Sequence, residues 1–224
     1  MVDMKIGPDG LAIVKSFESC LAPVKSKPGF FSAYYDPVHV LTIGWGHTND
    51  HPPKFDSATV WSQAQCDAAL ASDMRTFEAH VNGLAKVPLK QCEFDALVSW
   101  SFNTGGPATA SLWRQLNAGQ KDAIPANLAQ WNKAGGRVLN GLTRRRKAEG
   151  LLFQGKIKEA YQVAQAKMTT AQKAATGTAG AVVVGGAAAT AASVGWSWAE
   201  ISLTAFIAAA VVTAIVLLVK KARS

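Results

Sequence analysis

The first hydrophobic pattern in the chain predicts a short amphipathic helix near the N-terminus. Asp9 is a suitable N-cap for this helix. Apolar side chains then follow at helical spacing, at Leu11, Val14, Phe17 and Leu21. Glu18 falls near the C-terminal end of the same segment. We therefore expect the helix to place one carboxyl group beside apolar side chains.

The next segment changes from helical to strand-like spacing. Proline and glycine interrupt residues 22–33, which predicts a loop. The stretches 33–36 and 39–47 have the composition of two short strands, with Asp36 and Pro37 at the turn between them. We therefore expect a small β-hairpin directly after the first helix.

The remainder of the first 160 residues has the patterns of α-helices. Ser62 and Gln65 have the spacing of a capping box, which predicts a helix from there to about Val81. Residues 91–103 are apolar on nearly all sides, as in a buried central helix. Shorter helices are predicted around 109–117, 122–133 and 142–154. The expected fold is mainly α, of the α+β type, with the hairpin near the N-terminus.

The composition changes after about residue 165. Alanine, glycine and threonine dominate residues 161–197, which is typical of a linker. Residues 201–219 are 19 uncharged and strongly apolar residues, enough for a helix to cross a hydrocarbon layer of about 30 Å. Interfacial side chains flank this stretch, with Trp196 and Trp198 on one side and Lys220, Lys221 and Arg223 on the other.

These patterns predict three parts. They are a folded domain over 1–160, a linker over 161–197, and a transmembrane helix with a basic cytoplasmic tail over 198–224. The alternative for 201–219 is a buried helix of a soluble domain. The first 20 residues have no apolar core long enough for a signal peptide, so we expect them to begin the folded domain.

The charge distribution suggests a polyanionic partner. The formal net charge is +8, and residues 114–147 contain eight basic residues against one acid, Asp122. Such a surface favours nucleic acid, an anionic membrane or an acidic cell-wall polymer. The chain has no nucleic-acid recognition motif, so we expect no nucleic-acid partner.

The chain has three cysteines, Cys20, Cys66 and Cys92, and no pair of them has CxxC spacing. Buried structural thiols are therefore expected, and zinc is disfavoured by the spacing. We expect no metal and no cofactor. Cys20 follows Glu18 by two positions, so a redox influence on that residue is a second interpretation.

Glu18, Asp36 and Thr42 form the candidate catalytic group. Glycosidic cleavage needs a proton donor for the departing oxygen, and a carboxylate that handles the water or the developing positive charge. The two acids must lie in different environments, so that one is protonated while the other is ionised. Glu18 has apolar neighbours, Asp36 lies at a polar turn, and the Thr42 hydroxyl can hold a water. Alone, this pattern is unspecific.

The residues around these three resemble the phage-type lysozymes, glycoside hydrolase family 24. Glu18, Asp36 and Thr42 match the Glu…Asp…Thr signature of that family, and Gly44, Gly46 and His47 match its Gly-x-Gly-His element. The likeness covers roughly residues 5–155 and continues in "FDALVSWSFNTG" (94–105), "LWRQLNAG" (112–119) and "WNKAGGRVLNGLTRRRKAE" (131–149). One departure is the gap between Glu18 and Asp36, which is longer than in the compact members.

The resemblance implies a peptidoglycan-degrading endolysin that cleaves the β-1,4 bond between N-acetylmuramic acid and N-acetylglucosamine. Glu18 would act as the general acid, while Asp36 and Thr42 position the water. One alternative is a lytic transglycosylase, which cuts the same bond without water. Another is a catalytically silent wall-binding or membrane-disrupting protein on the same scaffold.

Several further side chains are candidates for substrate binding. Tyr35, Trp45 and Trp113 either stack on sugar rings or fill the core. Asn103 either faces the cleft or caps its helix, and His47 either binds substrate or makes structural hydrogen bonds. The resemblance also suggests that at least one of the arginines at 144–146 pairs internally with an acid such as Glu149.

The tail suggests attachment to the host inner membrane through residues 201–219. With a single span, the catalytic domain faces the periplasm or cell wall. A second insertion over 175–195 would leave the domain in the cytoplasm, and the weak hydrophobicity of that stretch favours the single span. Peptidoglycan glycan strands are the expected partner, and a holin is a candidate partner for the membrane step.

Overall fold

The computed structural model describes residues 3–36 and 39–166. Helix α1 (Pro8–Phe17) forms as the pattern predicts and ends immediately before Glu18, which is its C-cap residue. The N-cap is Gly7 rather than Asp9. Proline is favoured in the first turn of a helix, because its missing N–H would have no partner there, and this moves the start of the helix ahead of Asp9. Asp9 lies in the first turn, where its negative charge complements the helix dipole.

The predicted hairpin is part of a larger β region. Strands β2 (Tyr34–Tyr35), β3 (Leu41–Ile43) and β4 (His47–Thr48) form an antiparallel meander. The expected single strand over 39–47 is divided into β3 and β4, because Gly44 and Gly46 adopt positive φ angles of 62° and 96° and turn the chain. Strand β1 (Phe30–Ser32) forms in the predicted loop and pairs with β5 (Val60–Ser62).

The capping box and the central helix are confirmed. The Ser62 side chain accepts a hydrogen bond from the Gln65 backbone, and the Gln65 side chain accepts one from the Ser62 backbone, at the start of α2 (Gln63–Leu84). Every residue from Glu93 to Asn103 in α3 (Gln91–Thr104) is buried. The later elements are α4 (Ser111–Asn117), the 3₁₀ helix η1 (Lys121–Ala123), α5 (Ile124–Ala129), β6 (Lys133–Ala134), β7 (Arg137–Val138), α6 (Asn140–Phe153) and α7 (Ile157–Gln165).

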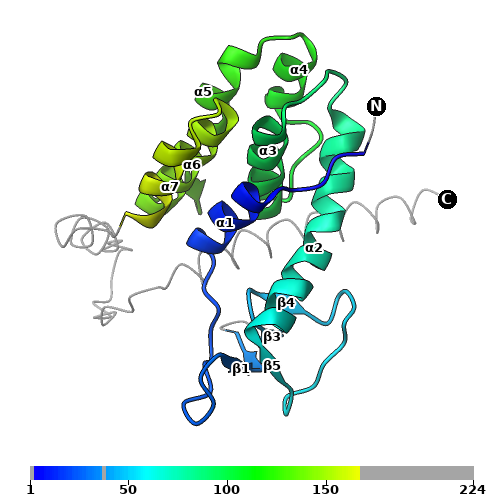
Figure 1. Ribbon diagram of the computed structural model, residues 1–224. Helices are drawn as coiled ribbons and strands as arrows, with labels where there is room; N and C mark the ends of the chain where they lie inside the picture. Colours follow the sequence, from blue (N-terminus) through cyan, green and yellow to red (C-terminus); the bar gives the residue numbers. More distant parts are fainter. Residues whose placement is uncertain (1–2, 37–38, 167–224) are drawn as a thin grey trace, which may run out of the picture.

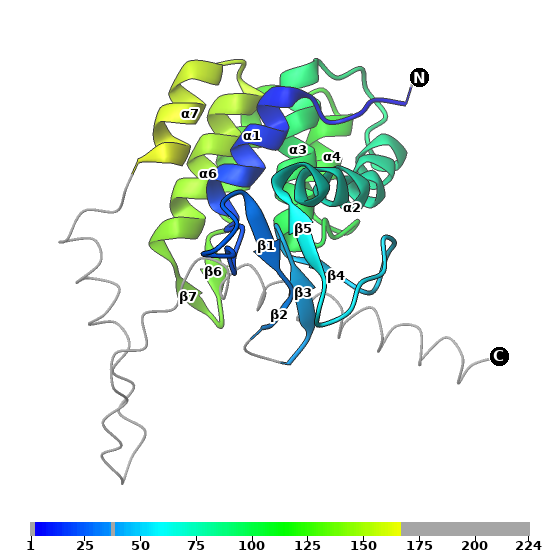
Figure 2. The ribbon, with the colours of Figure 1, turned by 60° about the horizontal axis from the view of Figure 1, so that its bottom comes forward.

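The elements form two regions joined by one long helix. Strands β1 to β5 gather at one end, helices α3 to α7 lie at the other, and α2 reaches from one region to the other (Figures 1 and 2). Helix α3 is central and packs against α1, α2 and α6. The main core therefore lies around α3, and a smaller cluster of buried residues lies between the strands and α2, formed by Ile43, Trp61, Cys66 and Ala69.

The predicted membrane helix over 201–219 and the predicted linker lie outside the described residues, apart from the linker's first residues 161–166. Residues 161–165 continue α7. Within residues 3–36 and 39–166, no helix has both the length and the apolar character that a bilayer span requires.

Candidate active site

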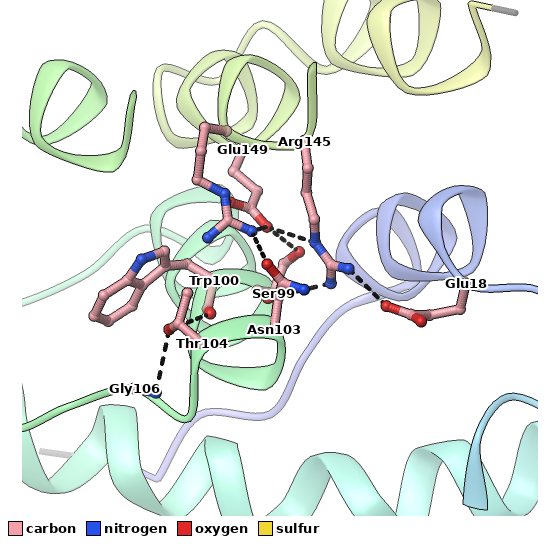
Figure 3. Close-up of polar contacts among 9 residues, drawn as sticks. Glu18, Ser99, Trp100, Asn103, Thr104, Gly106, Arg145 and Glu149 are labelled. Atoms are coloured by element: carbon pink, nitrogen blue, oxygen red, sulfur yellow. Dashed lines mark hydrogen bonds and ion pairs between the residues drawn. The ribbon is translucent and has the colours of Figure 1, made fainter. Parts of the chain in front are cut away.

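Glu18 lies where α1 ends, with its side chain directed into the protein. Its backbone N–H donates to the Val14 carbonyl at 3.1 Å, which closes the last helical turn. Its side chain is 8% exposed. The Arg145 Nη1 atom donates a hydrogen bond of 2.6 Å to Glu18 Oε1 (Figure 3). The carboxylate is therefore held by a charged partner from α6, which is far away in the sequence.

A buried ionic cluster behind Glu18 holds Arg145 in place. Glu149 is fully buried, and its Oε1 atom accepts hydrogen bonds from Arg145 Nε at 3.2 Å and from the Ser99 hydroxyl at 2.8 Å. Arg146 forms an ion pair with the same carboxylate, with 2.9 Å between its Nε atom and Glu149 Oε2. The expected pairing of an arginine with Glu149 is thus confirmed twice. Two cations and two anions balance one another, as buried charges require.

Arg146 extends this cluster toward α3. Its guanidinium is 1% exposed, and its Nη2 atom donates to Asn103 Oδ1 at 2.7 Å. Burial lowers the pKa of Arg146 to about 10, and the Glu149 charge opposes that effect. Asn103 and Ser99 come from α3 and point toward Arg145 and Glu149 (Figure 3). Asn103 is therefore fixed on the side of α3 that faces the Glu18 region, with a buried amide.

Asp36 and Thr42 share one backbone partner across the β2–β3 connection. Asp36 Oδ1 accepts a hydrogen bond of 2.8 Å from the Val40 N–H. The Thr42 hydroxyl donates to the Val40 carbonyl at 3.0 Å. Both side chains are buried, with 6% of Asp36 and 1% of Thr42 exposed. The backbone of Val40 therefore sets the positions of the carboxylate and the hydroxyl together.

Tyr34 lies near the candidate acids and was not predicted as a site residue. It is paired with Thr42 across β2 and β3, so these two side chains lie on the same face, and Asp36 directly follows the strand. Burial raises the pKa of Tyr34 to about 12, and the charges of Asp36, Cys20 and Glu18 add to this effect. The Glu18 and Asp36 carboxylates therefore both lie within electrostatic reach of one phenol. The period of two along the strand was the signal that could have found it.

The other candidate substrate-binding residues lie in different environments. Tyr35 is 60% exposed. Trp113 is 4% exposed and lies in the main core, where its Nε1 atom donates a hydrogen bond to the Pro107 carbonyl. Of the two interpretations of Trp113, sugar stacking or core packing, the structure therefore matches core packing. Trp45 is half-buried and donates through Nε1 to Asp67 Oδ1 at 2.7 Å. Only Tyr35 of these three presents most of its ring to solvent.

His47 uses both ring nitrogens within the protein. Nδ1 lies 2.9 Å from Asp73 Oδ2, and Nε2 lies 2.9 Å from the Pro53 carbonyl oxygen. Both neighbours are acceptors, so a doubly protonated ring satisfies both contacts. His47 therefore joins β4, α2 and the loop at Pro53, which matches the structural interpretation of this residue.

Comparisons with known proteins point to one family. A family model described as "Phage lysozyme" matches residues 28–149. The chain is 36% identical over 155 residues to an endolysin of Bacillus phage B103, which covers 67% of this chain and 54% of that protein. It is 35% identical over 121 residues to a SAR-endolysin of Escherichia phage Mu, which covers 53% of this chain and 68% of that protein.

The solved structures show the same likeness. A mutant of P22 lysozyme superposes with a TM-score of 0.58 at 29% identity, covering 67% of this chain and 99% of that one. The chain spans only 54–60% of the length of two curated relatives, the endolysins of Bacillus phage B103 and Lactococcus phage c2. The fold and the family match, which extends over more than half of the sequence, show that this chain belongs to the phage lysozyme family.

Proposed function

We propose that this chain cleaves peptidoglycan at the β-1,4 bond between N-acetylmuramic acid and N-acetylglucosamine. The observation that carries the proposal is that Arg145 holds the Glu18 carboxylate at the end of α1, while the Val40 backbone holds Asp36 and Thr42 together. A proton donor and a second, separately fixed carboxylate are what cleavage of a glycosidic bond requires. Membership of the phage lysozyme family supports the same reaction class.

In the proposed reaction Glu18 is the general acid. Its Oε1 atom is held by Arg145, so Oε2 is the oxygen that would face the leaving glycosidic oxygen. The ion pair with Arg145 and the packing around it fix the direction of the carboxyl group, which is the main requirement for proton transfer to a bound sugar. In this role the Glu18 carboxylate, which pairs with Arg145 in the free protein, has to take up a proton before the glycosidic oxygen leaves.

Asp36 and Thr42 would position the attacking water. The Thr42 hydroxyl donates its hydrogen to the Val40 carbonyl, so its oxygen is left to accept a hydrogen from a water. That water would then direct a lone pair toward the sugar carbon. Asp36, fixed by the Val40 N–H, would accept the proton that the water loses. This arrangement corresponds to an inverting hydrolase.

Tyr35 follows Tyr34 on β2, so its side chain points away from the face that carries Tyr34 and Thr42, and 60% of it is exposed. We therefore propose that Tyr35 contacts a sugar away from the bond that is cleaved. Asn103 is held by Arg146 through its Oδ1 atom and its amide nitrogen is buried, so we propose that it positions Arg146 instead of binding a sugar.

One experiment separates the proposal from its two alternatives. Purified peptidoglycan is digested in water labelled with oxygen-18, and the soluble muropeptides are analysed by mass spectrometry. Hydrolysis predicts new reducing ends that carry the label. Anhydromuramic ends without label would indicate a lytic transglycosylase. The absence of soluble products would indicate a catalytically silent wall-binding protein.

We also propose that residues 201–219 anchor the protein in the bacterial inner membrane, with the catalytic domain facing the cell wall. The support comes from the apolar stretch and its aromatic and basic flanks in the sequence, and from a relative that is named a SAR-endolysin. A holin is a candidate partner. Protease treatment of intact spheroplasts tests the orientation, because an outward-facing domain is digested without detergent and a cytoplasmic one is protected.

A further inference from the structure

Two of the three cysteines meet beside the candidate active site. Cys20 follows Glu18 by two positions and is partly exposed, whereas Cys66 lies in the first turns of α2 and is 1% exposed. Cys20 packs against the small buried cluster that contains Cys66. They are 46 positions apart in the sequence, so the fold brings them together and no local motif does.

Cys20 lies against one face of α2. It packs against the buried cluster that includes Cys66 and Ala69 of α2, and both Cys66 and Gln63 influence the pKa of its thiol. Positions three apart lie on the same face of a helix, so both contacts come from one side of α2. The Cys20 thiol is therefore a close neighbour of Cys66 on this side of α2.

The surroundings of Cys66 hold both sides of this contact in place. Lys15 of α1 forms an ion pair of 2.9 Å with Asp67, and the Trp45 indole donates to the same carboxylate. A β-carbon added at Gly44 would lie 2.9 Å from Cys66 Sγ, so the β3–β4 turn packs directly on this thiol. The end of α1, the turn and the start of α2 thus converge at this cysteine pair.

We propose that Cys20 and Cys66 form a reversible disulfide that ties the segment carrying Glu18 to the start of α2. The pair is a site for thiol–disulfide exchange with a small disulfide such as oxidised glutathione. In an oxidising compartment the bond would be kept, and in a reducing one it would be lost. Its formation would restrict movement of the two regions at the point where Glu18 leaves α1.

The exchange proceeds in two balanced steps. The Cys20 sulfur, which is the accessible one, attacks oxidised glutathione and displaces one glutathione, forming a mixed disulfide. The Cys66 sulfur then attacks the Cys20 sulfur and displaces the second glutathione. One protein S–S bond forms, the glutathione S–S bond is reduced by two electrons, and the two thiol protons end on the two glutathione molecules.

The rate of this exchange in the folded protein should be slow. Burial raises the pKa of Cys20 to about 12, with the neighbouring Cys66 adding to the shift, and burial also raises the pKa of Cys66. The thiolate is the attacking form, so little of it is present at neutral pH. The equilibrium is therefore best reached by refolding the chain in the redox buffer.

The test uses the full chain, unfolded in denaturant and refolded in a mixture of oxidised and reduced glutathione. We expect the monomer to lose two hydrogens in mass, to keep one alkylatable thiol, and to give a proteolytic peptide that links Cys20 to Cys66. Cys20→Ser and Cys66→Ser should each abolish the link. Cys92→Ser is the matched control, because Cys92 lies on α3 with its sulfur 4.0 Å from the Phe153 carbonyl, and it should leave the link intact.

Two further readouts follow from the crosslink. The linked form should melt about 10 °C higher than the reduced form, because the bond closes a loop of 46 residues. Amide hydrogen exchange of residues 18–22 should slow when the link forms and recover after reduction. Three free thiols after refolding, a stable glutathione adduct on Cys20 without the link, or a link that requires Cys92 would each overturn the proposal.

Discussion

Arg145 donates a hydrogen bond of 2.6 Å to the Glu18 carboxylate across 127 positions of the sequence. The two side chains are 2% and 8% exposed, so the pair is almost entirely removed from water. Arg145 also reaches Glu149, which makes it the common partner of two buried acids. The geometry of the proposed general acid therefore depends on α6 as much as on α1.

Replacing Arg145 by methionine should lower the free energy of unfolding by about 3–5 kcal/mol, because removal of one partner leaves buried charges uncompensated. Glycan cleavage should fall as well, since Glu18 loses the contact that directs it. Urea unfolding followed by circular dichroism measures the first effect. Lys147→Met is the control, because Lys147 is an exposed residue of the same helix and should change stability by less than about 0.5 kcal/mol. Equal effects of the two variants would contradict the structural role of Arg145.

His47 should make stability depend on pH. Burial lowers the pKa of His47, but the hydrogen bonds to Asp73 and the Pro53 carbonyl, together with the Asp73 charge, outweigh it and raise the pKa above 6.5. The folded state then binds the proton more tightly than the unfolded state. The contribution to stability is complete below pH 6.5 and is lost as the pH rises through the folded-state pKa.

The measurement compares wild type with His47→Gln by urea unfolding over a range of about pH 5.5 to 9. The difference in unfolding free energy between them should shrink as the pH rises. His51→Gln is the control, because His51 is exposed and this variant should follow the wild-type curve. A difference that stays constant or grows with pH would show that the ring does not hold an extra proton in the folded state.

Gly10 in α1 should not tolerate a larger side chain. A β-carbon there would lie 2.7 Å from Ile6 Cγ1 and 2.8 Å from the Asp95 side chain. Gly10→Ala should therefore lower the free energy of unfolding by about 1–3 kcal/mol through overpacking. The same substitution at Gly83, in α2 with nothing within 4 Å, should raise it by about 0.5–1 kcal/mol. Denaturant midpoints measure both, and a stabilising Gly10→Ala would mean that α1 can move away from α3.

The sequence predicts local features of this fold well. The capping box at Ser62 and Gln65 and the burial of α3 follow from residues close together in the chain. The end of α1 was predicted only approximately, because the apolar spacing continues to Leu21 while the helix ends at Phe17. Division of the second strand was not predicted, since the alternating pattern continues through Gly44 and Gly46, while their positive φ angles turn the chain.

Features of the site that depend on distant residues were harder to predict. The contact between Arg145 and Glu18 has no local signature, because three consecutive arginines offer equal charge to any partner. Only the packing of α6 on α3 and α1 decides which of them is buried beside Glu18. The position of Trp113 also depends on distant residues. The sequence shows only an aromatic residue in a predicted helix, whereas the structure places it in the main core.

The central claim is that Glu18 is the general acid. Its most direct test is the rate at which purified glycan strands release reducing ends, compared between Glu18→Gln and Glu159→Gln. The glutamine at position 18 retains an acceptor for Arg145 but cannot donate a proton as an acid does, and Glu159 is an exposed acid on α7. Circular dichroism first checks that both variants are folded. Glu18→Gln should then lose about 10²–10⁴-fold in rate, while Glu159→Gln retains wild-type activity. Equal rates for the two variants would contradict the assignment of Glu18 as the general acid.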